Sequence, residues 1–275
     1  MSLKLMYITN NTDVALIAQK YGVDRIWVDL ETLGKEERQK HMNTVKSKHT
    51  VEDIKKIAPL LTTSEMLVRV NPWNENSAQE INDVIDAGAD MIMLPMWKTV
   101  AEVKSFIETV DGRCKIILLL ETKEAVECLD DVLKIHGIDE IHIGLNDLHL
   151  SYGLTFMYEL LSNGMIEEIC EKIKKTGIPY GFGGVARLGS GELLAEKIIR
   201  EHYRIGSTRA ILSRSFCNTE DITDIEEIEL IFRENVIAMR QFEELARELD
   251  EQSLDANHQE VIQIVNQIVK AKRGQ

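Results

Sequence analysis

Short apolar runs alternate with helical segments along most of this 275-residue chain. Continuous apolar runs of this kind are typical of parallel strands that are buried on both faces. Eight such runs occur, each followed by a helical segment, and this alternation predicts a (β/α)₈ TIM barrel. A doubly wound sheet is the main alternative, but the first run is not followed by GxGxxG and the chain has no P-loop motif. The eight predicted strands are residues 4–9, 25–30, 66–70, 91–95, 116–120, 141–144, 180–185 and 209–213.

The C-terminal part of the sequence is strongly helical, over residues 224–250 and 257–272. This is more helix than the last unit of a barrel needs. We therefore expect one domain, in which residues 1–222 form the barrel core and residues 223–275 form extra C-terminal helices. These helices would pack on the barrel or exchange with a neighbouring subunit, and an amphipathic tail of this kind favours a homo-oligomer.

Composition and charge argue against several classes of protein. Acidic residues outnumber basic ones by 46 to 32, and no dense basic run is present, so nucleic acid is not an expected partner. The sequence starts without a signal-peptide pattern and no apolar run is long enough to span a bilayer, so we expect a soluble cytoplasmic protein that does not bind membranes. The cysteines lack the CxxC spacing of zinc sites. We expect reduced, mostly buried thiols at Cys114, Cys128, Cys170 and Cys217.

Charged side chains follow several predicted strands, at the C-terminal ends where α/β folds carry their chemistry. Glu121 follows the fifth strand and Asp147 the sixth, while Asp29 and Glu31 flank the end of the second. Arg69 lies near the end of the third strand, where a buried guanidinium needs an anionic partner. These residues predict a polar site at one end of the barrel. The alternative is structural: Glu121 and Asp147 as cap and turn residues, and Arg69 as an ion-pair partner.

The same strand ends carry a resemblance to a known family. Residues 118–153, LLLETKEAVECLDDVLKIHGIDEIHIGLNDLHLSYG, resemble the metal-site region of the HpcH/HpaI aldolase and citrate lyase β-subunit family of pyruvate/phosphoenolpyruvate-type barrels. WVDLE at residues 27–31, VRVNP at 68–72 and AGADMIMLP at 87–95 also resemble this family. Together these parts cover residues 26–154, in the family's order and spacing.

The resemblance implies a role for each matching residue. Glu121 and Asp147 would bind a divalent cation such as Mg²⁺ or Mn²⁺ and leave open positions for water and a 2-oxo acid. Arg69 would stabilise the oxygen of the metal-bound pyruvate enolate. The peptide N–H groups of Leu145, Asn146 and Asp147 would bind the substrate carboxylate. The implied activity is that of a class II pyruvate-type aldolase, a carbon–carbon lyase that cleaves or forms a 4-hydroxy-2-oxo acid.

Two departures from the family pattern bear on this mechanism. The aldolase branch carries a Glu-His pair after the second strand, whereas this chain has Glu31 and Thr32, so the usual histidine for proton transfer is absent. Leu145 replaces the usual proline of the Asp147 loop. Glu31 and Asp29 would then take part in catalysis directly or orient water on the metal, with Glu31 the favoured residue.

Two alternative functions stay open at this point. The tripeptide DLE at residues 29–31 is closer to the citrate lyase β and malyl-thioester lyase branch of the family. Enzymes of that branch act on a CoA thioester. The missing Glu-His pair is also compatible with a barrel that binds a 2-oxo acid and a metal without turnover.

Histidines and glycines give weaker indications. His142 alternates with apolar residues inside a strand, as buried structural residues do, and His149 is a candidate replacement for the missing histidine. His41 and His49 lie in a polar segment, residues 32–49, that is long for a βα loop and could reach the barrel mouth.

The last two strands carry a further pattern. Gly183 and Gly184 lie near the end of the seventh strand, and Ser213 and Arg214 near the end of the eighth. Barrels often bind phosphate at this position. Close packing of the glycines and a surface ion pair of the arginine would explain the same residues.

Overall fold

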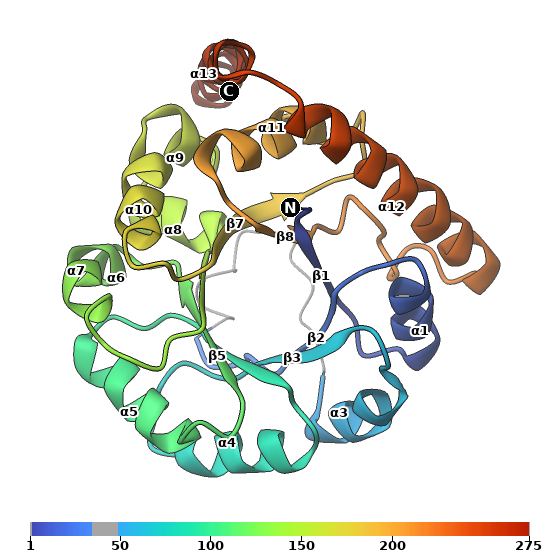
Figure 1. The fold of residues 1–275 in the computed structure, drawn as a ribbon, viewed down its shortest axis with the longest axis vertical. Coiled ribbons are helices and arrows are strands. Elements are labelled where there is room, and N and C mark those ends of the chain that lie inside the picture. Colours follow the sequence, from blue (N-terminus) through green and yellow to red (C-terminus); the bar gives the residue numbers. More distant parts are fainter. Residues whose placement is uncertain (1, 35–48, 275) are drawn as a thin grey trace.

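The predicted strands form a closed parallel barrel surrounded by helices in a computed structural model of the chain, which describes residues 2–34 and 49–274 (Figure 1). Neighbouring strands in the sequence are paired, and β8 closes the barrel against β1. The predicted (β/α)₈ TIM barrel is confirmed, and every predicted strand lies within one residue of the observed one. The strands are β1 Lys4–Ile8, β2 Arg25–Asp29, β3 Glu65–Arg69, β4 Met91–Leu94, β5 Lys115–Leu120, β6 Glu140–Ile143, β7 Tyr180–Val185 and β8 Arg209–Leu212.

Helices follow the strands and begin at the capping residues that the sequence provides. Thr50 and Asp53 form the capping box of α3, as their spacing predicts. Residues 35–48, which include His41 and most of the predicted polar loop, lie outside the described residues. The helices are α1 Thr12–Lys20, α3 Val51–Ile57, α4 Ser77–Asp86, α5 Val100–Val110, α6 Lys123–Glu127, α7 Leu129–Val132, α8 Leu145–Ser151, α9 Glu159–Ser162, α10 Met165–Lys174, α11 Ala195–Ile205, α12 Ile225–Arg247 and α13 Glu251–Arg273, with a 3₁₀ turn at η1 Ala58–Leu60.

The structure corrects two predictions around the sixth strand. The single helix expected between β5 and β6 is two short helices, α6 and α7, which are separated at Cys128. The sequence predicts a loop over residues 146–153 after the sixth strand, but most of these residues lie in α8. Leu145 and Leu148 are both buried in this helix, and packing of these side chains favours a short helix that local propensity does not predict.

Two helix starts also differ from the prediction. The sequence predicts a helix over residues 191–203, but this helix begins at Ala195, because Gly191 has a left-handed φ of 100° that a helix cannot contain. The last helix begins at Glu251, six positions before the expected residue 257, because the Asp250 side chain caps it by accepting a hydrogen bond from the Ser253 N–H.

The barrel interior is filled by a layer of side chains that come only from strands. This layer separates the two ends of the barrel, so chemistry at the mouth is closed off from below. Trp27 and Leu119 form its upper surface, because both also line the cavity described below. The members of the layer are Met6, Trp27, Leu67, Met91, Met93, Ile117 and Leu119.

An ion-pair network closes the N-terminal end of the barrel. Arg25 is almost fully buried and donates from Nη1 to Glu140 at 2.7 Å and from Nε to Glu65 at 3.1 Å. Arg209 donates to the same Glu140 carboxylate at 3.0 Å. Burial opposes the charge of Glu140, but the two arginines outweigh it and lower the pKa of Glu140 to about 2.

The C-terminal helices pack on the outside of their own barrel (Figure 1). In α12, Glu243 accepts hydrogen bonds from the Leu3 N–H at 2.6 Å and from the Tyr203 hydroxyl at 3.1 Å. In α11, the fully buried Glu201 accepts a hydrogen bond from Asn257 of α13 at 2.9 Å. Buried carboxylates therefore fix α12 against Leu3 and α11, and α13 against α11. In addition, α12 packs on α1 and α13 packs on α9.

Two remaining expectations concern membranes and cysteines. Among the described residues, no helix combines the length and the apolar character that a membrane span requires. The cysteines are free thiols, as expected. Cys170 and Cys217 are buried, whereas Cys114 and Cys128 are only partly buried, so the expected burial holds for half of them.

Candidate active site at the barrel mouth

Glu121 and Asp147 come together at the C-terminal mouth of the barrel. Glu121 directly follows β5, and Asp147 lies in the first turn of α8, which begins just after β6. Because β5 and β6 are paired, the two carboxylates lie within electrostatic range of each other. Glu121 is buried, and its Oε1 accepts a hydrogen bond from the Met96 N–H at 3.1 Å. The two residues expected to bind a metal therefore share one site.

The absence of a side chain at Gly144 leaves room for the side chain of Glu121. A Cβ atom on Gly144 would lie 2.7 Å from Oε2 and 3.0 Å from Cβ of Glu121. The φ of Gly144 is −81°, which any residue adopts, so the close approach and not the backbone conformation explains the glycine. Sequence analysis missed this residue, although it stands between an apolar strand and the Asp147 loop.

The two carboxylates influence each other's ionisation. Burial and the nearby Asp147 raise the pKa of Glu121 well above its usual value, against the opposing effect of Arg69. In the described part of the chain, no group of three or more His, Cys, Asp or Glu side chains is arranged to hold a metal ion. Two carboxylates with access to a cavity are nevertheless a donor set that fits a hard cation such as Mg²⁺ or Mn²⁺, which accepts water and substrate oxygens at its other positions.

Arg69 lies at the end of β3 in a cluster with Asp29, the last residue of β2, and Glu31, which follows it. It donates from Nε and Nη2 to the Asp29 carboxylate, each at 2.8 Å, and its Nη2 lies 3.2 Å from Glu31. The guanidinium carbon lies 5.1 Å from the centre of the Trp27 ring. Burial opposes the charge of Arg69, but Asp29 and Glu31 outweigh it and raise the pKa above its usual value. Asp29 and Glu31 therefore orient Arg69 and keep it charged.

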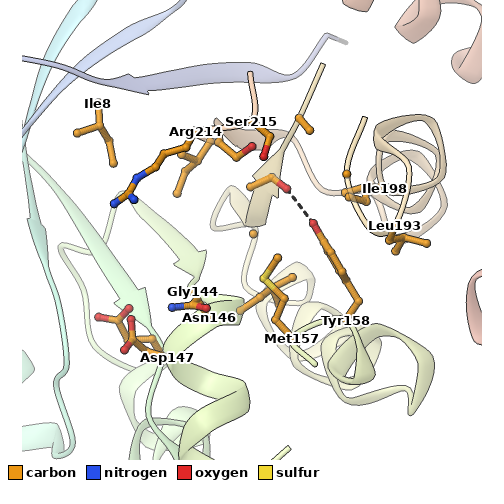
Figure 2. A pocket seen from close by; sticks show the side chains of 18 of the residues that line it. Ile8, Gly144, Asn146, Asp147, Met157, Tyr158, Leu193, Ile198, Arg214 and Ser215 are labelled. Atoms are coloured by element: carbon orange, nitrogen blue, oxygen red, sulfur yellow. Dashed lines mark hydrogen bonds between the residues drawn. The ribbon is translucent and has the colours of Figure 1, made fainter. Parts of the chain in front are cut away.

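A cavity of about 540 Å³ opens beside these residues. Figure 2 shows Asp147, Gly144 and Asn146 on one side of this cavity and Arg214 and Ser215 on another. Its walls come from the ends of strands and from the segments after β6, β7 and β8. The residues on the side of the two carboxylates are Ile8, Trp27, Arg69, Leu119, Glu121, Gly144, Leu145, Asn146 and Asp147.

The first turn of α8 is part of this wall. Leu145, Asn146 and Asp147 all line the cavity. The helix makes its first internal hydrogen bond from the Leu148 N–H to the Gly144 carbonyl at 3.1 Å, so the three preceding N–H groups are not used by the helix itself. The replacement of the usual proline by Leu145 leaves this turn helical.

The predicted histidines differ in their positions. His142 is fully inside the barrel, with Nε2 3.3 Å from the Gly183 carbonyl, and burial lowers its pKa to about 4. His149 is also buried, with Nδ1 3.2 Å from the Leu145 carbonyl. No histidine is found among the described residues that line the cavity.

His49 lies at the end of β2, beside the acidic cluster. Its Nδ1 accepts a hydrogen bond from the Asp29 N–H at 2.9 Å. An accepting Nδ1 carries no proton, so the neutral ring holds its proton on Nε2. At the position of the family's missing histidine, the Thr32 N–H donates to the Asn71 side chain at 2.9 Å, which fixes the start of the loop.

Comparison with known proteins gives a family and a fold. A family model described as HpcH/HpaI aldolase/citrate lyase matches residues 4–185. A protein named hydroxypyruvate/pyruvate aldolase, from Rhizorhabdus wittichii, is 28% identical, and the match covers 52% of this chain and 72% of that protein.

Solved structures share the architecture at low sequence identity. An HpcH/HpaI aldolase from Desulfitobacterium hafniense DCB-2 superposes with a TM-score of 0.61 at 17% identity, covering 83% of this chain and 93% of that one. The citrate synthase SbnG superposes with a TM-score of 0.59 at 17% identity, covering 83% and 94%. These likenesses establish the common fold.

Proposed function

Because the chain belongs to the HpcH/HpaI aldolase/citrate lyase family, we propose that it is a metal-dependent carbon–carbon lyase of the pyruvate-aldolase type. Its reaction would cleave or form a 4-hydroxy-2-oxo acid. The observation that carries this proposal is that Glu121, Asp147 and Arg69 line one cavity at the barrel mouth. The name of the 28%-identical relative, a hydroxypyruvate/pyruvate aldolase, supports a 2-oxo acid as the substrate.

Glu121 and Asp147 are the residues that would hold the cation. A divalent cation such as Mg²⁺ or Mn²⁺ would supply a Lewis acid for the keto group of the substrate. The N–H groups of Leu145, Asn146 and Asp147, which line the same cavity, are the groups that we assign to the substrate carboxylate. The two carboxylates and the helix turn would thus bind and orient a 2-oxo acid from two adjacent elements.

Arg69 is the group that we assign to the developing negative charge on the keto oxygen. Its Nε and Nη2 donate to Asp29, and Nη2 lies 3.2 Å from Glu31. A guanidinium that is held in this way beside the cavity is preorganised for an oxyanion. Trp27 and Leu119 close the floor of the cavity with apolar surface, which strengthens this interaction by excluding water.

Proton balance requires a base and an acid near the cavity. In the aldol direction, a proton leaves C3 of the 2-oxo acid, C3 forms a bond to the aldehyde carbon, and the aldehyde oxygen takes up a proton. We assign to the Nε2–H of His49 a hydrogen bond to the aldehyde oxygen, because its Nδ1 already accepts from the Asp29 N–H beside the Asp29–Arg69 pair, and water in the cavity takes up the C3 proton. Glu31 and Asp29 affect the reaction indirectly, because their contacts orient the Arg69 guanidinium.

Proton exchange tests this function without knowledge of the aldehyde. Pyruvate in D₂O with the protein and Mg²⁺ or Mn²⁺ is expected to lose its methyl proton signal in NMR, and only when metal is present. Arg69→Ala is expected to slow exchange about 10²- to 10³-fold, as removal of an oxyanion donor does in other enzymes. Glu121→Gln, which removes one carboxylate charge, is expected to raise the metal concentration needed for exchange.

Arg113→Ala is the matched control, because Arg113 lies before β5 at the opposite end of the barrel and contacts backbone carbonyls of α5. This variant should exchange at the wild-type rate. If folded wild-type protein shows no exchange with either metal, or if Arg69→Ala exchanges as fast as wild type, the proposed function is wrong.

A further inference from the structure

The turn after β4 contains a backbone conformation that its residue does not favour. Met96 has a left-handed φ of 53°, and Met96 and Asp111 are the non-glycine residues with positive φ in the part of the chain that the structure describes. In this conformation the Cβ atom of an L-residue crowds the backbone, so glycine or asparagine is usual there. Such conformations persist only where surrounding contacts enforce them, and they cluster at functional sites.

Contacts on both sides of Met96 hold this conformation. Pro95, which precedes it, is buried, and its pyrrolidine ring fixes its own φ. Trp97, which follows it, is 1% exposed and packs in the main hydrophobic core. The Trp97 carbonyl accepts a hydrogen bond from the Thr122 hydroxyl at 2.8 Å. The turn after β4 is therefore fixed to the residue that directly follows Glu121.

The left-handed conformation determines the direction of one N–H group. The Met96 N–H donates to Oε1 of Glu121 at 3.1 Å. In a turn whose two ends are fixed, the sign of φ is coupled to the orientation of the preceding peptide plane, as the dihedral angles of type I and type II turns illustrate. A negative φ at Met96 would therefore flip the peptide between Pro95 and Met96 and turn its N–H away from Glu121.

The Glu121 carboxylate has a different neighbour at each oxygen. Oε1 faces the Met96 N–H, whereas Oε2 lies on the side of Gly144, where an added Cβ atom would be 2.7 Å away. Gly144 directly precedes α8, whose first turn carries Asp147. The turn after β4 thus holds one oxygen of Glu121, and the other oxygen lies on the side of the second carboxylate.

We propose that Met96 is a positioning residue for the metal site, because its left-handed backbone directs the N–H to Oε1 of Glu121 and so orients Oε2 toward the cation. This inference rests on the proposed function, in which Glu121 and Asp147 hold the cation. The role belongs to the backbone of residue 96. A residue that accepts a positive φ can therefore take it over, whereas a β-branched residue cannot.

The test compares substitutions at residue 96 that differ in backbone preference. Met96→Gly keeps the N–H and accepts a positive φ without strain. Met96→Val is β-branched, so a positive φ is strained and the preceding peptide is expected to flip. The Kd for Mn²⁺, measured by the electron paramagnetic resonance signal of the free ion, should stay close to the wild-type value in Met96→Gly. It should rise about 10- to 100-fold in Met96→Val, the range for disturbed support of a metal ligand.

Asp111→Val is the matched control for backbone strain. Asp111 has a φ of 50° and is the exposed C-cap of α5, where the chain leads into the N-terminal end of β5, opposite to the mouth. Both valine variants should lower the melting temperature without metal, whereas only Met96→Val should lose Mn²⁺ affinity. Wild-type affinity in folded Met96→Val would overturn the proposal. An equal loss in Met96→Gly would also overturn it, because the effect would then lie in the methionine side chain.

Amide hydrogen exchange is a second measurement that does not require Met96→Val to fold. In protein labelled with ¹⁵N-methionine, the signal of Met96 is the one that is absent from Met96→Leu. Glu121→Ala removes the acceptor and should speed the exchange of this amide about tenfold or more, as expected for a lost hydrogen bond to a charged group. An unchanged exchange rate of the Met96 amide in Glu121→Ala would overturn the proposal.

Failure of the proposed function is recognised separately. A wild-type protein that binds Mn²⁺ with the expected pattern of variants, but does not exchange the methyl protons of pyruvate, supports the positioning role of Met96 and rejects the lyase function. A folded wild-type protein that binds no Mn²⁺ overturns the positioning role itself.

Discussion

Replacement of Gly144 by alanine is the most direct test of the metal site that we propose. The backbone of Gly144 has φ −81° and ψ 89°, so an alanine causes no conformational strain there. The added Cβ would lie 2.7 Å from Oε2 of Glu121, whereas ordinary contacts at such a carbon begin at about 3.4 Å. The substitution therefore acts mainly on Glu121, because the next neighbour of the added methyl group, Cδ1 of Leu119, lies at 3.4 Å.

The size of the effect follows from these distances. Relief of the overlap needs a shift of about 0.7 Å in the Glu121 carboxylate, the difference between 3.4 and 2.7 Å. The hydrogen bond from the Met96 N–H to Oε1 resists this movement. Metal–ligand distances tolerate only about 0.2 Å, and disturbed support of a metal ligand typically costs about 10- to 100-fold in affinity. We expect the Kd for Mn²⁺ in Gly144→Ala to rise by this factor.

The protein is titrated with Mn²⁺, and the free ion is measured by its electron paramagnetic resonance signal. Thermal unfolding is recorded in parallel. Gly184→Ala is the matched control, because its Cβ would lie 3.3 Å from Cβ of Ser213, on the other wall of the cavity. It should bind Mn²⁺ as wild type does. The reasoning is refuted if Gly144→Ala binds Mn²⁺ with wild-type affinity, or if Gly184→Ala loses affinity equally.

Two further predictions concern the ends of the barrel. The pKa of Glu140 is lowered from 4.5 to about 2, so its ionisation contributes about 3 kcal/mol of stability above pH 4.5, and this is lost as the pH falls toward 2. Glu140→Gln should lower the free energy of unfolding at pH 7 by a similar amount and flatten its dependence on pH in chemical denaturation; an unchanged dependence contradicts the assignment. At the mouth, His49→Asn keeps a side-chain acceptor for the Asp29 N–H but removes Nε2. It should slow addition to the aldehyde about 10²-fold or more while keeping the pyruvate exchange and the thermal stability of the wild type, and a wild-type rate of addition would exclude His49 from this role.

The strands and the identity of the clustered acids could be predicted because both depend on local sequence. Each strand is a short apolar run with polar neighbours, and parallel barrels bring all C-terminal strand ends to one face. This rule predicts that Glu121 lies near Asp147 and that Arg69 lies near Asp29. It does not predict the register of β2 and β3, in which Asp29 lies directly opposite Arg69, because the register depends on closure of the whole sheet.

The remaining features depend on contacts between distant parts of the chain. Helix α8 is only seven residues long and is held by the burial of Leu145 and Leu148, so its own sequence reads as a loop. The fit of Gly144 against Glu121 is a contact of atoms, and a glycine in a sequence does not reveal what occupies its missing side chain. Arg25 and Glu140 are 115 positions apart, and only the closed barrel brings them together.

Two buried glutamates at opposite ends of the barrel have opposite pKa shifts, one that contributes to stability and one that we link to metal binding. Glu140 accepts hydrogen bonds from two arginines, and its pKa falls to about 2, so the protein itself compensates this charge. Glu121 faces Asp147, and its pKa rises well above the usual value even though Arg69 opposes the rise. A divalent cation favours the ionised form of both carboxylates at the mouth, so its binding releases protons and stabilises the fold. Added Mg²⁺ or Mn²⁺ should therefore raise the melting temperature of the wild-type protein, and the gain should disappear in Glu121→Gln and persist in Glu140→Gln.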